Sequence, residues 1–281
     1  MKPSRLAGYA FAAAGAACWS LGGALVRLTE NVDLWQIIFY RSLTVLLCMG
    51  LWLGLRFRSA FFARLADAGL NAVIAGVAVG IAGLTFVAAL FYTTVAQAIF
   101  MTGITPFLSA MLGFWILREK IPPITWLAMT VALIGMGVIF AGNAGGGALT
   151  GTILAIYSAF CFSCYAVLLR WGQRTEMSVA LIWNALFLLV ISALIMLLPV
   201  GVREHAGAAS FMIGWKNLAV IGVMGAVQLT LGLILFTVGS RSVPAAQLSL
   251  IALIEPTLSP RREPAAIHGR AVLPGRRATP R

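Results

Sequence analysis

Apolar residues run through this chain in long blocks separated by short polar segments. Nine blocks are recognised, near residues 7–26, 34–55, 71–92, 95–117, 123–141, 151–169, 178–199, 217–238 and 243–260. About 20 apolar residues in a helix cross the roughly 30 Å hydrocarbon layer of a bilayer. Strand alternation is absent, and an open strand could not satisfy its backbone in lipid. The pattern predicts an all-α polytopic membrane protein with eight full transmembrane helices and a partial ninth.

The composition agrees with this prediction, because 61% of the residues are hydrophobic and only 10% are charged. Soluble domains carry roughly 25% charged residues. The net charge of +12 could indicate nucleic-acid binding, but the basic residues are scattered singly between the apolar blocks. This scatter favours a membrane-topology signal. The expected partners are therefore the lipid bilayer and a small-molecule substrate, without nucleic acid, and a homodimer is left open.

The four cysteines lie inside apolar blocks, and we expect them to serve packing. Cys161 and Cys164 have the spacing of a redox CxxC motif, but that chemistry needs a polarised, accessible thiol. The sequence contains no GxxxxGK loop and no metal-ligand cluster, and both histidines lie outside the apolar blocks. No cofactor or metal is expected.

An internal repeat links the two halves of the chain. "GYAFAAAGAACWSLGGALVR" (8–27) aligns with "GTILAIYSAFCFSCYAVLLR" (151–170) at an offset of 143 residues. The offset becomes 150 further on, where Gln97 meets Gln247 and Pro106 meets Pro256. Matches that stay in register over three helix pairs indicate a duplication.

The first half contains five spans, an odd number, so the second half must enter the membrane from the opposite side. We expect two inverted five-helix repeats, over residues 1–142 and 143–260, with the second incomplete and followed by a basic, non-native disordered tail at 261–281. Before residue 243, ten Lys and Arg residues fall on the N-terminal side of the membrane and three on the other. This bias places the N-terminus in the cytoplasm.

The end of the chain departs from the repeat. The similarity between the halves stops at Ser259, and a crossing ninth helix would carry the six arginines of the tail to the outside. Our hypothesis is that the sequence from about residue 260 is truncated or out of frame and that a tenth helix is missing. The alternative is a natural basic tail on a nine-helix protein.

Three residues near the bilayer centre are the first candidates for a transport site. Pro106 and Pro256 occupy matched positions, and a proline inside a helix removes a hydrogen bond and kinks the chain, so the pair would shape one midplane cavity. The alternative is that both prolines serve helix packing. Glu255 lies deep in a span, where a carboxylate usually faces a cavity or a partner and could couple protons or contact a cation. If the ninth helix is broken, Glu255 instead lies near an interface.

Other polar and aromatic residues complete the candidate pathway. Arg41 is an anion contact, a partner for Glu255 or a cation that binds carbonyl groups in helix packing. The remaining candidates either line the path or serve helix bridging, core packing or the interfacial belt: Gln97, Gln228, Gln247, Asn184, Trp19 and Tyr92. Asn184 is the repeat counterpart of Arg41. Gly76, Gly80 and Gly83 are expected to allow close helix packing.

These motifs resemble the EamA-type members of the drug/metabolite transporter superfamily. The resemblance covers residues 5–260 and includes "YRS", "TPFLSAMLGFWILREKIPP", "GMGVIFAG" and "IEPTLSP" in order. It implies ten helices in two inverted repeats around a central cavity, with small metabolites as substrates and export as a frequent direction. The missing end of the ninth helix and the missing tenth depart from this pattern.

Together these features favour a multi-pass secondary transporter of the bacterial inner membrane. We expect it to export small metabolites or drug-like solutes by alternating access, driven by a gradient because no ATP-binding motif is present. An enzyme is not expected, because paired Asp, or His with Ser, is lacking in the spans. The alternative is a non-transporting helical scaffold or receptor, or an inactive truncated fragment.

Overall fold

The computed structural model describes residues 4–26, 28–30, 32–93, 95–118, 121–141, 149–173, 175–198 and 211–252. Every regular element in these ranges is helical. Glu255, Pro256 and the predicted tail lie outside the described residues.

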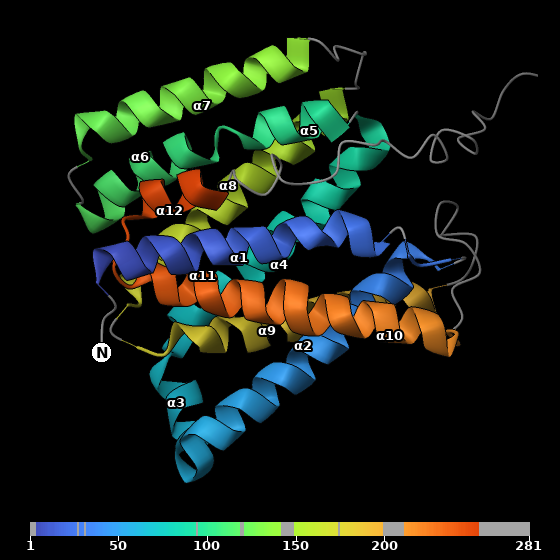
Figure 1. Cartoon of the computed structure of the whole chain (residues 1–281). Coiled ribbons are helices and arrows are strands. Elements are labelled where there is room, and N and C mark those ends of the chain that lie inside the picture. The colour runs from blue at the N-terminus through green and yellow to red at the C-terminus, as the bar shows by residue number, and fades with distance from the viewer. Residues whose placement is uncertain are drawn as a thin grey trace, which may run out of the picture.

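The helices follow the apolar blocks of the sequence. In the first half they are α1(Arg5–Val26), α2(Leu34–Phe57), η1(Arg58–Ala60), α3(Phe61–Asp67), α4(Gly69–Tyr92), α5(Val95–Thr102), α6(Thr105–Leu117) and α7(Pro123–Ala141). In the second half they are α8(Leu149–Trp171), η2(Met177–Val179), α9(Ala180–Leu197), α10(Trp215–Val223), η4(Met224–Leu231), α11(Gly232–Ser240) and α12(Ala245–Ala252). Figure 1 shows their arrangement.

Local sequence fixes where α2 begins. The Asp33 carboxylate accepts the backbone N–H of Trp35, and the Gln36 side chain in turn accepts the backbone N–H of Asp33. This reciprocal capping box satisfies backbone donors that a helix start leaves unpaired. The polar segment before the second apolar block therefore becomes the start of a helix.

The protein is a multi-pass membrane protein. Six stretches in the described part of the chain are long and apolar enough to cross a bilayer: Leu34–Asp67, Gly69–Leu90, Phe100–Leu117, Leu149–Trp171, Met177–Leu197 and Trp215–Ser240. The shorter Pro123–Gly135 is also apolar. The all-helical fold is confirmed, whereas the number of eight full transmembrane helices stays a prediction.

Apolar side chains also cover the outside of the bundle. Leu47, Leu51 and Leu55 recur one helical turn apart on α2, and each is more than 60% exposed. On α7 a similar stripe includes Leu127 and Ile134. Large exposed apolar stripes of this kind suit contact with lipid chains rather than water.

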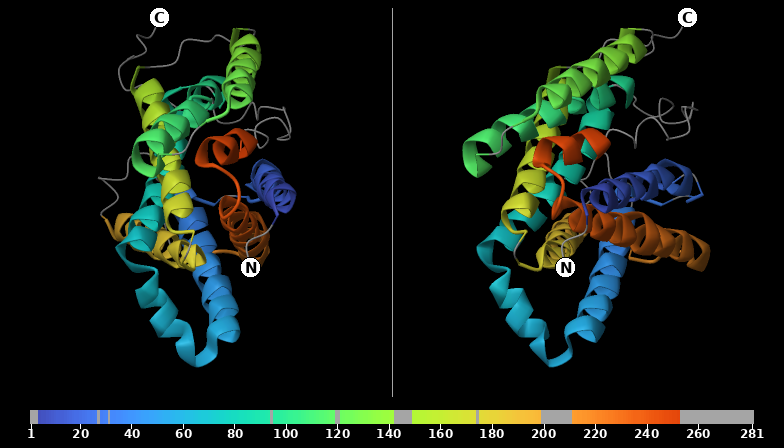
Figure 2. Two further views of the ribbon diagram at one scale, coloured as in Figure 1. Left: turned by 90° about the vertical axis from the view of Figure 1, so that its left-hand side faces the viewer. Right: turned by 60° about the vertical axis from the view of Figure 1, so that its left-hand side comes forward.

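The core lies between helices that come from opposite halves of the chain. α4 packs on α8, α1 packs on α11, and α2 packs on α9. A buried cluster from these helices includes Met49, Tyr165, Leu181 and Phe236. In Figure 2 the elbow between α2 and α3 projects away from the other helices. The two halves therefore share one core.

Small residues bring two of these helices close together. A Cβ added at Gly76 on α4 would lie 2.3 Å from the carbonyl oxygen of Ala180 on α9, and one at Gly80 would lie 2.7 Å from the Phe187 ring. A Cβ at Gly83 would meet nothing within 4 Å. Gly76 and Gly80 thus serve close packing as expected, but Gly83 does not.

Around Pro106 the structure differs from the expected kinked helix. α5 ends at Thr102 and α6 begins at Thr105, so Pro106 lies in the first turn of a new helix. A proline is tolerated there because the first N–H groups of a helix have no partner within it. The side chain of Thr105 donates to the Thr102 carbonyl, and Ser163 on α8 donates to the Thr105 carbonyl at 3.1 Å. The Thr105 hydroxyl thus pairs with the Thr102 carbonyl, which Pro106 cannot reach with a backbone N–H.

A second irregularity interrupts the span at 215–240. Residues Met224–Leu231 form the π-helical segment η4 between α10 and α11. The Thr230 hydroxyl donates to the carbonyl of Gly225, five residues earlier, at 2.8 Å. Single π-helical turns inside longer helices are often found at functional sites.

Candidate functional site

Buried polar atoms without partners gather at η4. The Trp19 side chain on α1 is 7% exposed and that of Gln228 on η4 is 8% exposed. The Gln228 amide nitrogen lies 3.5 Å from the Trp19 carbonyl oxygen. The indole Nε1 of Trp19 and the Oε1 of Gln228 are both buried without a hydrogen-bond partner among the described residues. One unused donor and one unused acceptor thus lie at the contact between α1 and η4.

Glycines make room for these two side chains. A Cβ at Gly22 would lie 2.3 Å from the Gln228 amide nitrogen, and one at Gly232 would lie 2.7 Å from the Trp19 Nε1. Gly22 is on α1 and Gly232 directly follows η4, so each side of this helix contact has a glycine where the two helices approach closely. The glycines therefore position the Trp19 indole and the Gln228 amide within the helix contact.

The stretch of α2 from Arg41 to Thr44 lies against η4. A Cβ at Gly225 on η4 would lie 2.8 Å from the Arg41 carbonyl oxygen and 2.6 Å from the Thr44 Cβ. The Nε of Arg41 and the hydroxyl of Ser42 are buried and, within the described ranges, have no partner. α1, α2 and η4 thus each carry buried polar atoms without partners, and α2 meets η4 through the Arg41 carbonyl and Thr44.

A second group of unpaired atoms lies on α9. Asn184 is 4% exposed, and its Oδ1 and the indole Nε1 of Trp183 are buried without partners in the described part of the chain. A Cβ at Gly80 of α4 would lie 3.0 Å from the Asn184 Oδ1. Asn184 therefore approaches α4 through its side chain, whereas Arg41 contacts η4 through its carbonyl oxygen.

Aromatic rings adjoin Trp19 on its other side. Its ring centroid is 4.9 Å from that of Phe236 and 6.0 Å from that of Phe162. Tyr165 stacks on Phe236, and its hydroxyl lies 3.5 Å from that of Thr237. The polar atoms at η4 are therefore bordered by an aromatic cluster.

Gln97 and Gln247 bridge helices. The Gln97 amide donates to the Thr152 hydroxyl on α8 at 2.8 Å. The Tyr9 hydroxyl on α1 donates to Gln247 at 2.6 Å, and the Gln247 amide donates to the Thr125 hydroxyl on α7 at 3.0 Å.

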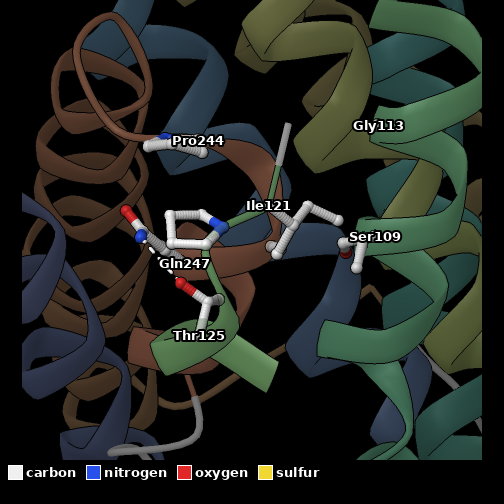
Figure 3. Close-up of a pocket in the computed structure, with 9 residues that line it drawn as sticks. Ser109, Gly113, Ile121, Thr125, Pro244 and Gln247 are labelled. Carbon is white, nitrogen blue, oxygen red and sulfur yellow. Dashed lines mark hydrogen bonds between the residues drawn. The ribbon is translucent and has the colours of Figure 1, made fainter. Parts of the chain in front are cut away.

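A small pocket between α6, α7 and α12 is lined by Gln247, Thr125, Ser109 and Pro244, among others (Figure 3). The Ser109 hydroxyl lies 2.6 Å from that of Ser249, so these two groups are already paired. Most polar groups of this pocket thus have partners, unlike those at η4.

Charged side chains meet at one end of the bundle. The Glu176 carboxylate is 2.9 Å from Arg241, at the end of α11, and 3.7 Å from Arg56 on α2. Ser178 donates to the same carboxylate at 2.8 Å. Arg170 on α8 donates to the carbonyl of Arg241 at 2.9 Å. This cluster ties the ends of three helices together.

Of the sequence-predicted residues, Trp19 and Gln228 are in contact, and Arg41 contacts η4 through its carbonyl oxygen. Asn184 lies on α9, Gln97 and Gln247 lie in helix bridges, and Pro106 is buried at the start of α6. Tyr92 is 54% exposed at the end of α4, away from this region. Sequence reasoning missed Ser42 and the Glu176 ion pairs. Proximity to Arg41 could have indicated Ser42, but only the fold brings Arg241 to Glu176.

Comparisons with known proteins confirm the family resemblance. The model of the EamA-like transporter family matches residues 6–141. An uncharacterized transporter of Clostridium kluyveri is 28% identical over 201 residues, which cover 69% of this chain and 62% of the relative. A crystal structure of another protein matches with a TM-score of 0.74 at 19% identity, covering 91% of this chain and 86% of that chain. That last likeness concerns the fold alone. Over residues 6–141, the chain carries a domain of the EamA-like transporter family.

Proposed function

We propose that this protein is a secondary membrane transporter of small metabolites or drug-like solutes, with its solute site at η4. The observation that carries the proposal is the group of buried, unpaired polar atoms of Trp19, Gln228 and Arg41. A buried polar atom without a partner costs about 1–3 kcal/mol, so a bound solute that pairs with it recovers that free energy. The EamA-like domain and the likeness to a transporter support transport rather than catalysis.

We further propose that the site lies between two inverted repeats, residues 1–142 and 143–260. The way the helices pair supports this division. The first helix of each half packs on the other half: α1 packs on α11, and α8 packs on α4. The second helix of each half does the same: α2 packs on η4, and α9 packs on α4. At the offsets found in the sequence, α8 corresponds to α1, α9 corresponds to α2, and α10–α11 correspond to α4. Replacing each helix by its counterpart in the other half therefore gives the same set of helix pairs.

Individual contacts repeat at the same offsets. A Cβ added at Gly8 would lie 3.0 Å from the Cγ2 of Val243. A Cβ added at Gly151 would lie 2.7 Å from the Cβ of Thr93. Gly151 follows Gly8 by 143 residues, and Val243 follows Thr93 by 150. These two glycine contacts are equivalent under exchange of the halves.

Two hydrogen bonds follow the same rule. Tyr9 binds Gln247, and Thr152 binds Gln97, so the first helix of each half holds the short helix of the other half. A third pair of contacts agrees with the glycine contacts and the glutamine bonds. Gly15 approaches the carbonyl of Gly232, and its counterpart Ser158 donates to the carbonyl of Ala82, the counterpart of Gly232, at 2.7 Å. A two-fold relation of this kind supports alternating access, in which one half rocks against the other.

We propose export across the bacterial inner membrane, with the N-terminus in the cytoplasm. The end of the bundle that holds Glu176 also holds Arg56, Arg170 and Arg241, all on the side that the positive-inside rule assigns to the cytoplasm. The opposite end holds Glu30, whose backbone bonds to Asn217 beside Lys216. This uneven distribution of basic residues supports the orientation.

A flux experiment tests the proposal. Purified protein in proteoliposomes is assayed with a panel of radiolabelled small metabolites, and Gln228→Leu and Trp19→Phe are compared with the wild type. Loss of one hydrogen bond to the solute should lower flux roughly tenfold at limiting solute concentration, since about 1.4 kcal/mol is a factor of ten. Thr130→Val, on the exposed face of α7, is the matched control and should leave flux unchanged. Flux equal to that of protein-free vesicles for every solute, or unaffected by both site variants, would contradict transport at η4.

A further inference from the structure

Arg41 is a cationic residue of α2, a helix that packs against η4. It lies seven residues after the first residue of α2, inside a stretch long and apolar enough to span the membrane. Its carbonyl oxygen contacts the Gly225 position of η4, three residues before Gln228, and its Nε is buried without a partner. A charged side chain at such depth normally faces a partner or a polar cavity.

In the part of the chain that the structure describes, the helices packed against the body of α2 provide no carboxylate for Arg41. α2 contacts α9, η4 and α10, and also η1 and α3, which follow its C-terminal end. Asp67, the one carboxylate of α3, pairs with Arg64 of the same helix. Neither α9 nor η4 contains a charged residue, and the single charged residue of α10 is Lys216, which would repel a guanidinium group.

The carboxylates at the two ends of α2 have other roles. Asp33 caps α2 at its start. Glu176 pairs with Arg241 and with Arg56, which lies near the end of α2. Within the described ranges, Arg41 forms no hydrogen bond through Nε and no ion pair. Its charge is thus left for a ligand.

The geometry points to an organic anion as the solute of this site, an inference that rests on the proposed transport function. A guanidinium group binds a carboxylate or a phosphate through two parallel N–H donors, which gives both charge and geometric selectivity. The unpaired Oε1 of Gln228 accepts a donor on the same solute, and the Trp19 indole supplies a second N–H. The Trp19, Phe162 and Phe236 rings form an apolar wall for the body of the molecule.

A binding experiment with pairs of solutes that differ only in charge tests this inference. Purified protein in neutral detergent is titrated with formate, acetate and benzoate, with the uncharged formamide, acetamide and benzamide, and with inorganic phosphate and phenyl phosphate. The thermal unfolding midpoint reports binding. We expect at least one anion to raise the midpoint saturably, with half-saturation at least tenfold lower than for its uncharged partner. Arg41→Gln should abolish this preference, and Arg41→Lys should retain part of it, because the lysine keeps the charge but loses the paired donors.

The control is Arg64→Gln, which removes an exposed arginine from α3 and should leave anion binding unchanged. The carboxylate and phosphate arms separate the two anion classes, and a further arm adds phosphatidylglycerol in mixed micelles. Stabilisation by the lipid alone, lost in Arg41→Gln, would assign the site to a lipid headgroup and overturn the inference. Equal binding of anions and amides, unchanged anion binding in Arg41→Gln, or no stabilisation by any anion would also overturn it.

Glu255 provides a further discriminating variant. If Glu255 neutralises Arg41 in the protein, Glu255→Gln should create anion binding that the wild type lacks, and that result would overturn the inference. Different results would reject the proposed transport function and the proposed anion. Flux of uncharged solutes that depends on Gln228, without any anion binding, would leave transport standing and reject the anion. Arg41-dependent anion binding without flux of any solute would support the anion site and reject transport.

Discussion

At the scale of single residues, the contact between α4 and α9 depends on the absence of a side chain at Gly76. An added Cβ would lie 2.3 Å from the Ala180 carbonyl oxygen and 2.8 Å from the Asn184 backbone nitrogen, and neither backbone atom can turn aside. Overpacking of this kind costs about 1–3 kcal/mol. We therefore predict that Gly76→Ala lowers the thermal unfolding midpoint of the purified protein.

Gly83 on the same helix is the matched control for this prediction. Nothing lies within 4 Å of its Cβ position, so Gly83→Ala gains helix propensity of about 1 kcal/mol without a clash. Its midpoint should equal or exceed that of the wild type. Equal losses in the two variants would show that α4 does not approach α9 as the structure has it.

At the scale of elements, the Glu176 ion pairs join the ends of α2 and α11. The Glu176 and Arg241 side chains are 10% and 20% exposed, and the closest atoms are 2.9 Å apart. Charge-assisted hydrogen bonds that are shielded from solvent contribute about 1.5–3 kcal/mol. Glu176→Gln keeps the shape and an acceptor for Ser178 but removes the charge. We predict a lower unfolding midpoint, measured by intrinsic fluorescence.

The exposed pair of Arg64 and Asp67 provides the comparison. These side chains are 53% and 62% exposed, and their atoms are 3.7 Å apart. Surface ion pairs contribute roughly 0–1 kcal/mol. Asp67→Asn should therefore change the midpoint much less than Glu176→Gln does. A larger loss in Asp67→Asn would mean that the Glu176 cluster does not hold the helix ends together.

The sequence predicted the helical elements well but not their internal breaks. Apolar blocks locate the helices because burial in lipid requires a continuous apolar stretch. Pro106 indicated a disturbance near the centre of 95–117, but whether the chain kinks or starts a new helix depends on tertiary partners such as Ser163. The π-helical turn at 224–231 has no comparable marker, since Thr230 and Gln228 are ordinary residues of a polar helix face.

At the scale of the whole molecule, the account rests on two halves that share one core. The offsets of 143 and 150 residues could be read in the sequence, and they lead to the matched contacts of Tyr9 with Gln247 and of Thr152 with Gln97. The partners themselves could not be predicted, because Tyr9 and Thr152 differ in type and only the fold brings each to its glutamine. Trp19, Arg41 and Gln228, which carry unpaired buried atoms, are among the residues that the sequence predicts for the pathway, and their role there stays a prediction.

Distances between spin labels at the two ends of the bundle test alternating access between the halves most directly. In a variant without the four native cysteines, one pair of labels is placed at Leu55 and Trp171, near the Glu176 cluster, and a second pair at Leu28 and Trp215, at the opposite end. All four positions are more than 60% exposed. The account predicts that a transported solute, identified by the flux assay, shifts the two distance distributions in opposite directions. Distributions that stay fixed, or that widen or narrow together, would contradict it.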